Sequence, residues 1–158
     1  MGAPCLAFET WVYDGAMRNG MMKAVRAVFF LLSAAGVLTQ PLWSASPCDN
    51  VDRSLTDNTK GTLAPVIAKQ LHTQKVDVLQ SFRLEGWTII YVNSHDADES
   101  FLFYPHDPVH SRYVTRWGGA AAWNEEQSIK SWTLKNAPGI PPKLASCFAW
   151  HVTSDRDK

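Results

Sequence analysis

Apolar residues recur at helical spacing in three parts of the chain, one before and two after a β-rich middle. In the first part, one face of a predicted helix carries four apolar residues: Leu63, Val66, Ile67 and Leu71. The hydroxyl of Thr62 can cap this helix, and Pro65 is tolerated in its first turn. The pattern therefore predicts a helix that begins near Thr62.

Two further helices are predicted in the last third of the chain. Residues 124–127 (Asn-Glu-Glu-Gln) resemble a capping box and open a helix that turns Ile129 and Trp132 inward. Pro138-Gly139 ends this helix, and Pro141 suits the first position of the last one. The apolar stripe of the last helix consists of Leu144, Cys147, Phe148 and Val152.

Between these helices, four segments have the patterns of β-strands. Apolar residues alternate from Val76 to Leu84, and residues 87–92 are apolar on both faces, as in a central strand. Two more runs follow at 101–104 and 112–117. The connections are short and polar, which favours antiparallel neighbours because parallel strands need long crossovers. We therefore predict an α+β fold, a four-stranded antiparallel sheet with helices packed on one face.

The predicted strands are rich in aromatic side chains. If helices cover one face of the sheet, the other face is left to water or to a partner. Alternation puts Phe101 and Phe103 on one face and Leu102 and Tyr104 on the other, so some rings would point outward. Such a patch marks a protein or glycan surface, unless all the rings face the helices or are scattered singly. The possible binding face consists of Trp87, Phe101, Phe103, Tyr104, Tyr113 and Trp117.

A basic and then apolar segment near the N-terminus has the pattern of a secretory signal peptide. Lys23 and Arg26 precede the apolar run 27–38, and residues 42–46 supply small side chains for a signal peptidase. An uncleaved anchor or a buried core helix is the alternative. The run is shorter than the roughly 20 residues that span a bilayer, and it shows no polar face. A lipoprotein is disfavoured because Pro47 stands directly before Cys48.

The first twenty residues do not have the composition of a signal peptide. They carry two acidic residues, whereas a signal peptide begins with a short positive segment. We interpret residues 1–20 as a misassigned start that precedes the doublet Met21-Met22. The predicted organisation is then a signal peptide at 21–45 and a single periplasmic or secreted domain at 46–158.

The composition of the exported part excludes one class of partner. Its 113 residues carry twelve Lys and Arg against thirteen Asp and Glu. A nucleic-acid binder would show a basic excess or stripe.

No second hydrophobic run is long enough to span a bilayer, so we expect no stable membrane span after cleavage. Five tryptophans make a substantial hydrophobic core credible.

The exported part contains two cysteines, Cys48 and Cys147. In an oxidising compartment an even pair indicates a disulfide. This bridge would tie the N-terminus of the domain to its last helix. The alternative is two unrelated thiols, one at a frayed end and one buried in a helix.

Histidines and carboxylates gather in two polar loops. These loops contribute five residues to a candidate polar site: His95, Asp96, His106, Asp107 and His110. Two histidines four apart bind one metal when a helix aligns them, but Pro105 and Pro108 make a helix unfavourable here. Residues 96–99 resemble a calcium loop but lack its glycine and its downstream Glu. We therefore predict solvated turns, with no metal and no cofactor.

No catalytic motif stands out in the chain, and the catalytic residues stay unknown. There is no G-x-S-x-G turn, and Cys147 is predicted to be bridged. The segment 118–122 (Gly-Gly-Ala-Ala-Ala) leads to a helix start, where backbone amides could hold an anion. Glu125 and Glu126 already occupy that helix start, which favours a close-packed connection instead.

Three runs carry a resemblance to known proteins: 86–92 (GWTIIYV), 101–104 (FLFY) and 139–149 (GIPPKLASCFA). The chain resembles small uncharacterised exported proteins of proteobacteria. The resemblance implies a location in the bacterial envelope. It assigns no activity and no catalytic residue.

Three hypotheses of function remain. The first is a non-enzymatic periplasmic or secreted binding module for a protein or glycan of the cell envelope, such as an inhibitor or an immunity-type protein. The second is a small hydrolase or isomerase that uses a His-Asp pair from the loops at 93–99 and 105–112. The third is a small-ligand carrier with a pocket between the sheet and the helices. We favour the first, and a convergent cleft holding a His beside a carboxylate would favour the second.

Overall fold

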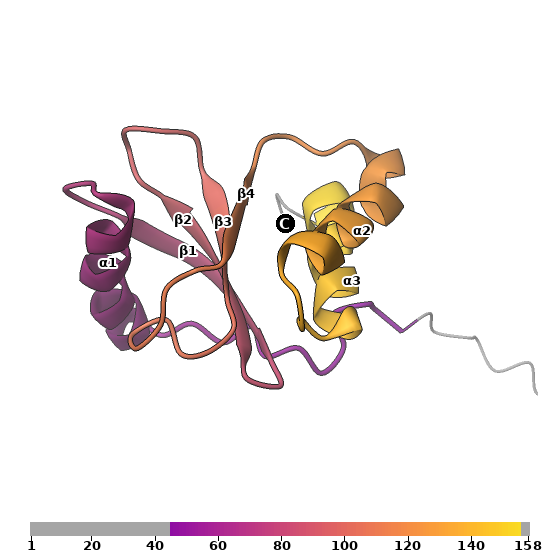
Figure 1. Ribbon diagram of the computed structural model, residues 1–158, viewed down its shortest axis with the longest axis horizontal. Coiled ribbons are helices and arrows are strands. Elements are labelled where there is room, and N and C mark those ends of the chain that lie inside the picture. Colours follow the sequence, from indigo (N-terminus) through magenta and orange to yellow (C-terminus); the bar gives the residue numbers. More distant parts are fainter. Residues whose placement is uncertain (1–44, 156–158) are drawn as a thin grey trace, which may run out of the picture. The chain divides into compact units, whose positions relative to one another are not determined.

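The structure, a computed structural model, describes residues 45–155. The predicted start segment 1–20 and all but the last residue of the predicted signal peptide lie outside the described residues. Helices and strands follow one another as α1 (Asp57–Leu71), β1 (Asp77–Leu84), β2 (Trp87–Asn93), β3 (Ser100–Tyr104), β4 (Thr115–Gly118), α2 (Glu126–Asn136) and α3 (Pro142–Trp150) (Figure 1). A π-helical turn, His151–Asp155, continues α3. The predicted α+β fold is confirmed.

The four strands form one antiparallel sheet in the order β1-β2-β3-β4, as predicted. The β1–β2 turn has positive φ at both Glu85 (49°) and Gly86 (82°). A two-residue turn needs this backbone to match the twist of its strands. The edge strand β1 has a bulge between Val78 and Gln80 in its pairing with β2, and its Arg83 forms an isolated bridge to Asp52. Both features limit pairing with a further strand.

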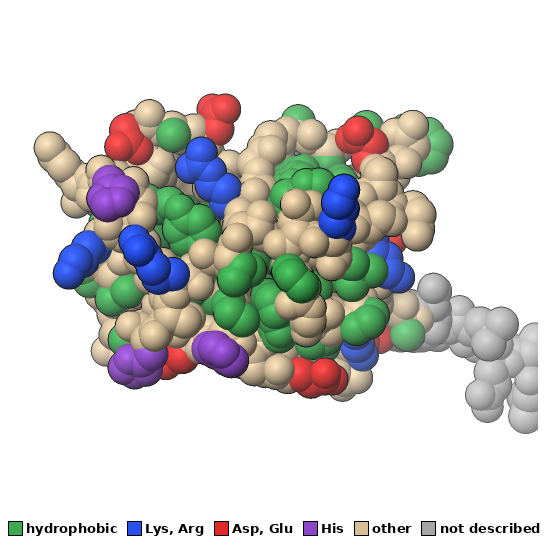
Figure 2. Space-filling model, viewed as in Figure 1, with side chains coloured by type: hydrophobic (Ala, Val, Ile, Leu, Met, Phe, Trp, Pro, Cys, Tyr) green, Lys and Arg blue, Asp and Glu red, His purple; other side chains and the backbone are tan. Residues whose placement is uncertain are grey.

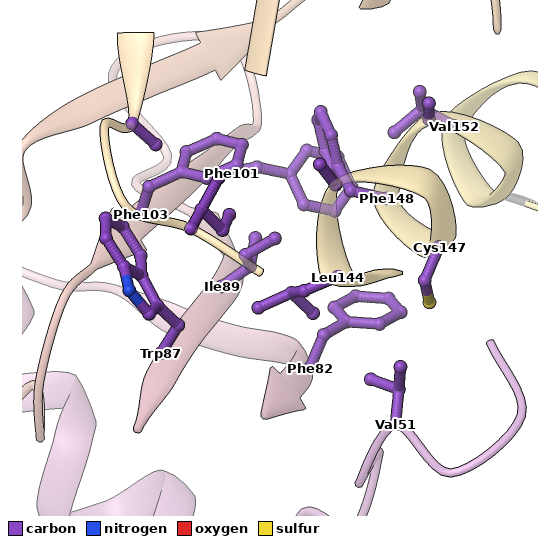
Figure 3. Packing of buried hydrophobic residues seen from close by; sticks show 14 of the residues in the cluster. Val51, Phe82, Trp87, Ile89, Phe101, Phe103, Leu144, Cys147, Phe148 and Val152 are labelled. Atoms are coloured by element: carbon purple, nitrogen blue, oxygen red, sulfur yellow. The ribbon is translucent and has the colours of Figure 1, made fainter. Parts of the chain in front are cut away.

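Apolar side chains lie on both faces of the sheet, and each face packs against different helices (Figure 1). The cluster on the first face joins α1 to the sheet and consists of Leu63, Ile67, Ala68, Val76, Val78, Ile90, Val92, Leu102 and Tyr104. On the second face, strand residues meet Leu144 and Phe148 of α3 (Figure 3). These strand residues include Phe82, Ile89, Phe101 and Phe103. The sheet is therefore the middle layer of three.

The prediction that the helices pack on one face of the sheet is wrong. In β2 and β3, apolar residues occupy the positions that point to either face of the sheet, and nearly every residue in these strands is buried. Such strands need cover on both sides, because exposed apolar surface is unfavourable in water. The helix before the strands supplies one cover, and the two helices after them supply the other.

The predicted aromatic binding face is not formed, for the same reason. Four of its six rings are buried: Trp87, Phe101, Phe103 and Tyr104. Tyr113 and Trp117 are partly buried and pack against the two core clusters. Tyr113 also precedes β4, which begins at Thr115 and not at the predicted residue 112.

The first helix begins five residues earlier than the predicted Thr62. Thr56 is its N-cap, and the Thr56 side chain accepts a hydrogen bond from the backbone N–H of Thr59 (3.2 Å). Satisfying a free N–H of the first turn in this way stabilises a helix start. Pro65 therefore lies inside α1 and not in its first turn. The helix ends at Leu71, and its C-cap, His72, adopts the left-handed conformation (φ 58°).

The predicted bridge between Cys48 and Cys147 is confirmed, with the two Cα atoms 4.5 Å apart. It ties the segment before α1 to α3, and Cys48 and Val51 join the core cluster on the α3 side. The chain then passes the edge of β1 at Asp52 and reaches the opposite face as α1. Disulfides persist in oxidising compartments, so the bridge favours such a location. Within residues 45–155, no helix has the length and apolar character to cross a bilayer.

Candidate functional site

A cavity of about 730 Å³ lies on the α1 side of the sheet. Its walls come from the first half of α1, the β1–β2 hairpin and the loop that follows β3. The α1 residues at the cavity are Asn58, Thr59, Thr62 and Leu63. Its volume falls within the range of roughly 300–1,000 Å³ typical of small-molecule sites.

Gln70 fixes the loop after β3 against α1. Its side-chain amide donates to the backbone carbonyls of Pro108 (3.4 Å) and Ser111 (2.9 Å). The Gln70 carbonyl oxygen accepts from the hydroxyl of Tyr104 (3.1 Å), and burial raises the pKa of Tyr104. One partly buried side chain thus joins helix, strand and loop, and Pro108 and Val109 are held at the cavity wall.

Two hydroxyl-bearing strand residues, Ser81 and Thr88, lie at the base of the cavity. Ser81 is 2% exposed and Thr88 is 6% exposed. Strand alternation turns both side chains toward α1, because their neighbours Phe82 and Ile89 belong to the cluster on the other face. Within the described residues, neither hydroxyl makes a hydrogen bond to another protein group. Neither oxygen is among the fully buried, unpartnered side-chain atoms of the described residues, so both hydroxyls open onto the cavity and are available to an occupant.

The one cation at the cavity, Arg83, is already paired. Its side chain contacts the Asp52 carboxylate (2.9 Å) and donates to the backbone carbonyl and the hydroxyl of Ser54 (both 2.9 Å). The Ser54 hydroxyl and backbone N–H, followed by Arg83, hold the pKa of the Asp52 carboxyl below its usual value. At the opposite wall, the Asp107 carboxylate accepts from the N–H of Val109 (2.9 Å). The charged residues of the lining, Arg83, Glu85 and Asp107, are half-buried or exposed and form its rim, whereas the buried Ser81 and Thr88 form its base.

Replacing Ser54 by Ala should raise the pKa of Asp52, because it removes the largest stabilising contact of the carboxylate. With the folded pKa depressed, Asp52 stabilises the fold above its unfolded pKa of about 3.9. That contribution is lost as pH falls through the lower, folded pKa. A carboxyl-carbon NMR titration measures the midpoint. Ser131→Ala is the control, since that hydroxyl bonds within α2; an equal midpoint in wild type and Ser54→Ala would contradict the assignment.

The five residues of the predicted polar site do not come together. His95 pairs with Asp77 (2.8 Å), a carboxylate that also contacts Lys75 (3.2 Å). Lys75 and then His95 hold the pKa of Asp77 below its usual value, and hydrogen bonds from Thr73 and Ser94 do the same for Asp96. The remaining residues lie in the loop after β3, where His106 and His110 are exposed and Asp107 reaches the cavity.

No His-Asp pair joins the two polar loops within the described residues, so the pairing required by the enzyme hypothesis is not present. In the same part of the chain, no group of three or more His, Cys, Asp or Glu could hold a metal ion. On the face shown in Figure 2, acidic and basic side chains are interspersed, with no stripe of a single sign.

Sequence reasoning missed two features. Trp123, in the 3-10 turn before α2, is 82% exposed, although tryptophans are usually buried. His151 is fully buried behind α3, where its Nδ1 lies 3.6 Å from an Asp155 oxygen that Arg53 also contacts (3.3 Å). His151 packs against the ring of Phe82 (4.8 Å between centroids). This position closes the core and leaves no access for a substrate.

Comparison of the chain with known proteins identified no related protein. No protein-family model matches the chain, and no curated protein or solved structure is significantly similar to it. The geometry of the cavity is therefore the main guide to function.

Proposed function

We propose that the chain is a periplasmic or secreted, non-enzymatic binding module and that the cavity beside α1 is its binding site. The observation that carries the proposal is the pair of hydroxyls of two buried strand residues, Ser81 and Thr88, which open onto a cavity of about 730 Å³ without a hydrogen-bond partner among the described residues. The signal-peptide pattern, the resemblance to exported proteobacterial proteins and the disulfide support the location.

The lining of the cavity favours binding over catalysis. It offers hydroxyls, the Asn58 amide, apolar side chains and two exposed carboxylates, Glu85 and Asp107, and the Arg83 side chain is held by Asp52. General acid-base catalysis needs a titratable group within hydrogen-bond reach of the reacting atoms. Asp107, the one residue of the predicted polar site at the cavity, is exposed and accepts from its own loop.

A second candidate function is inhibition of, or immunity against, an envelope protein through the exposed ring of Trp123. Tryptophan is enriched among residues that dominate protein interfaces, and this one is 82% exposed. The ring follows the small side chains of 120–122, which would let a partner surface approach it closely.

Amide NMR spectra of the labelled domain in a solubilised envelope extract should separate the two candidates. If the cavity is the site, shifts should map onto α1 and the β1–β2 hairpin. Thr62→Phe should abolish these shifts, because a large ring on α1 would fill the cavity. Lys69→Phe is the matched control, since it places the same ring on an exposed α1 position outside the cavity.

Shifts that persist in Thr62→Phe would contradict the cavity as the site. Shifts confined to residues 120–126 and lost in Trp123→Ser would replace it with the protein-inhibitor candidate. A folded domain that shows no shift with any envelope fraction would refute both.

A further inference from the structure

The base of the cavity is uncharged. Ser81 and Thr88 are 98% and 94% buried, and neither side chain can ionise at physiological pH. The Arg83 side chain is paired with the Asp52 carboxylate. A charged ligand group that reached the base would lose its hydration without gaining a counter-charge, which is strongly unfavourable. The part of a ligand that enters this cavity should therefore be neutral.

The hydrogen-bonding groups of the cavity come from two opposed walls. Ser81 and Thr88 supply hydroxyls from the sheet, each with one donor and two acceptor sites. On α1, the Thr62 hydroxyl donates to the Asn58 carbonyl (3.0 Å) and keeps its lone pairs as acceptors. A ligand between these walls must carry both donors and acceptors on opposite edges.

Apolar side chains lie between these polar groups. Leu63 of α1 and Pro108 and Val109 of the loop supply the apolar side chains of the lining on this face of the sheet. A ligand that fits this alternation has hydroxyls along its edges and C–H groups on its faces. Sugars have this distribution of polar and apolar surface.

We infer that the cavity binds a neutral saccharide unit, with Ser81 and Thr88 hydrogen-bonding to its hydroxyls. This inference rests on the proposed binding function and names its ligand class. The source of the unit is either a free sugar or the end of an envelope glycan, and the same chemistry serves both.

The test is a titration of the labelled domain with glucose, N-acetylglucosamine, maltose and the β-1,4-linked dimer of N-acetylglucosamine, followed by amide NMR. At least one sugar should shift amides of the cavity walls. Glucuronate and glucosamine should bind at least tenfold more weakly than their neutral counterparts. Binding to an isolated cell-wall glycan that exceeds binding to the matching free sugar would identify the glycan as the source, and equal binding would identify the free sugar.

Variants at the base of the cavity make the test residue-specific. Thr88→Val keeps the shape of the side chain and removes its hydroxyl, so it should weaken sugar binding about tenfold, as expected for an unpaired ligand hydroxyl. Thr88→Ser restores a hydroxyl and should recover most of the affinity. Ser81→Ala should weaken binding to a similar extent, while Ser131→Ala, on the surface of α2, should have no effect.

Three results would overturn the inference. If no neutral sugar shifts the cavity amides but a blocked dipeptide or another envelope component does, the ligand class is wrong and the binding function stands. If sugars bind with equal affinity to wild type and Thr88→Val, the hydroxyls do not recognise them. If nothing binds at the cavity, the proposed function fails as well.

Discussion

Replacing Cys48 and Cys147 together by Ala should lower the free energy of unfolding by about 4–5 kcal/mol. The bridge closes a loop across a sequence separation of 99 residues. In the chain-entropy account, the stabilisation comes from restricting the unfolded chain, and it grows with loop length. Urea unfolding of the two proteins under non-reducing conditions measures the difference.

The same loss should appear when the wild type is reduced, and reduction should not change the double variant. Ser146→Ala is a matched control on α3, because the exposed Ser146 hydroxyl bonds only to the Pro142 carbonyl of its own helix. A loss below about 1 kcal/mol in the double variant would contradict the expected stabilisation. Two free thiols in protein recovered from the envelope would contradict the bridge itself.

The strands and the disulfide bridge could be predicted from local sequence patterns. Period-two apolar runs and short polar connections specify an antiparallel order without knowledge of the tertiary structure. The turn at Glu85-Gly86 needed a residue that tolerates positive φ, and Gly86 meets that need. Two cysteines in an exported domain leave one possible pairing, so composition alone predicted the partner of Cys48.

The layer arrangement was not predicted, although one signal for it was present. Residues 101–104 are apolar at every position, on both faces of the strand, which is typical of a strand covered on both sides. We interpreted half of these side chains as an open binding face. The start of α1 was missed because Gly61 weakens helix propensity, while the Thr56 cap that offsets it lies outside the apolar stripe.

The cavity could not be predicted from sequence. Its residues come from three segments, 58–63, 81–88 and 107–109, that only tertiary packing brings together. Ser81 and Thr88 are common residues with no motif around them. The exposure of Trp123 could not be predicted from sequence either, because hydrophobicity alone does not distinguish an interface ring from a core ring.

Replacing Phe101 by Ala should destabilise the domain by about 3–5 kcal/mol, the range for a large ring removed from a core. Phe101 is fully buried and stacks on Tyr91 with ring centroids 4.2 Å apart. It also meets Phe148 of α3 edge-on at 5.1 Å, so the ring connects the sheet to the helical layer. Its loss would leave a cavity that rigid neighbours on both sides cannot fill.

Trp123→Ala is the matched control, since it removes a still larger ring from the surface. It should change the free energy of unfolding by no more than about 0.5 kcal/mol. Thermal and urea unfolding of both variants measure the contrast. If Phe101→Ala were tolerated as well as Trp123→Ala, the ring would not be core, and an aromatic face open to a partner would again be the better account of this sheet. If Trp123→Ala unfolded the domain instead, its ring would be part of the fold, and the inhibitor candidate would lose the observation that favours it.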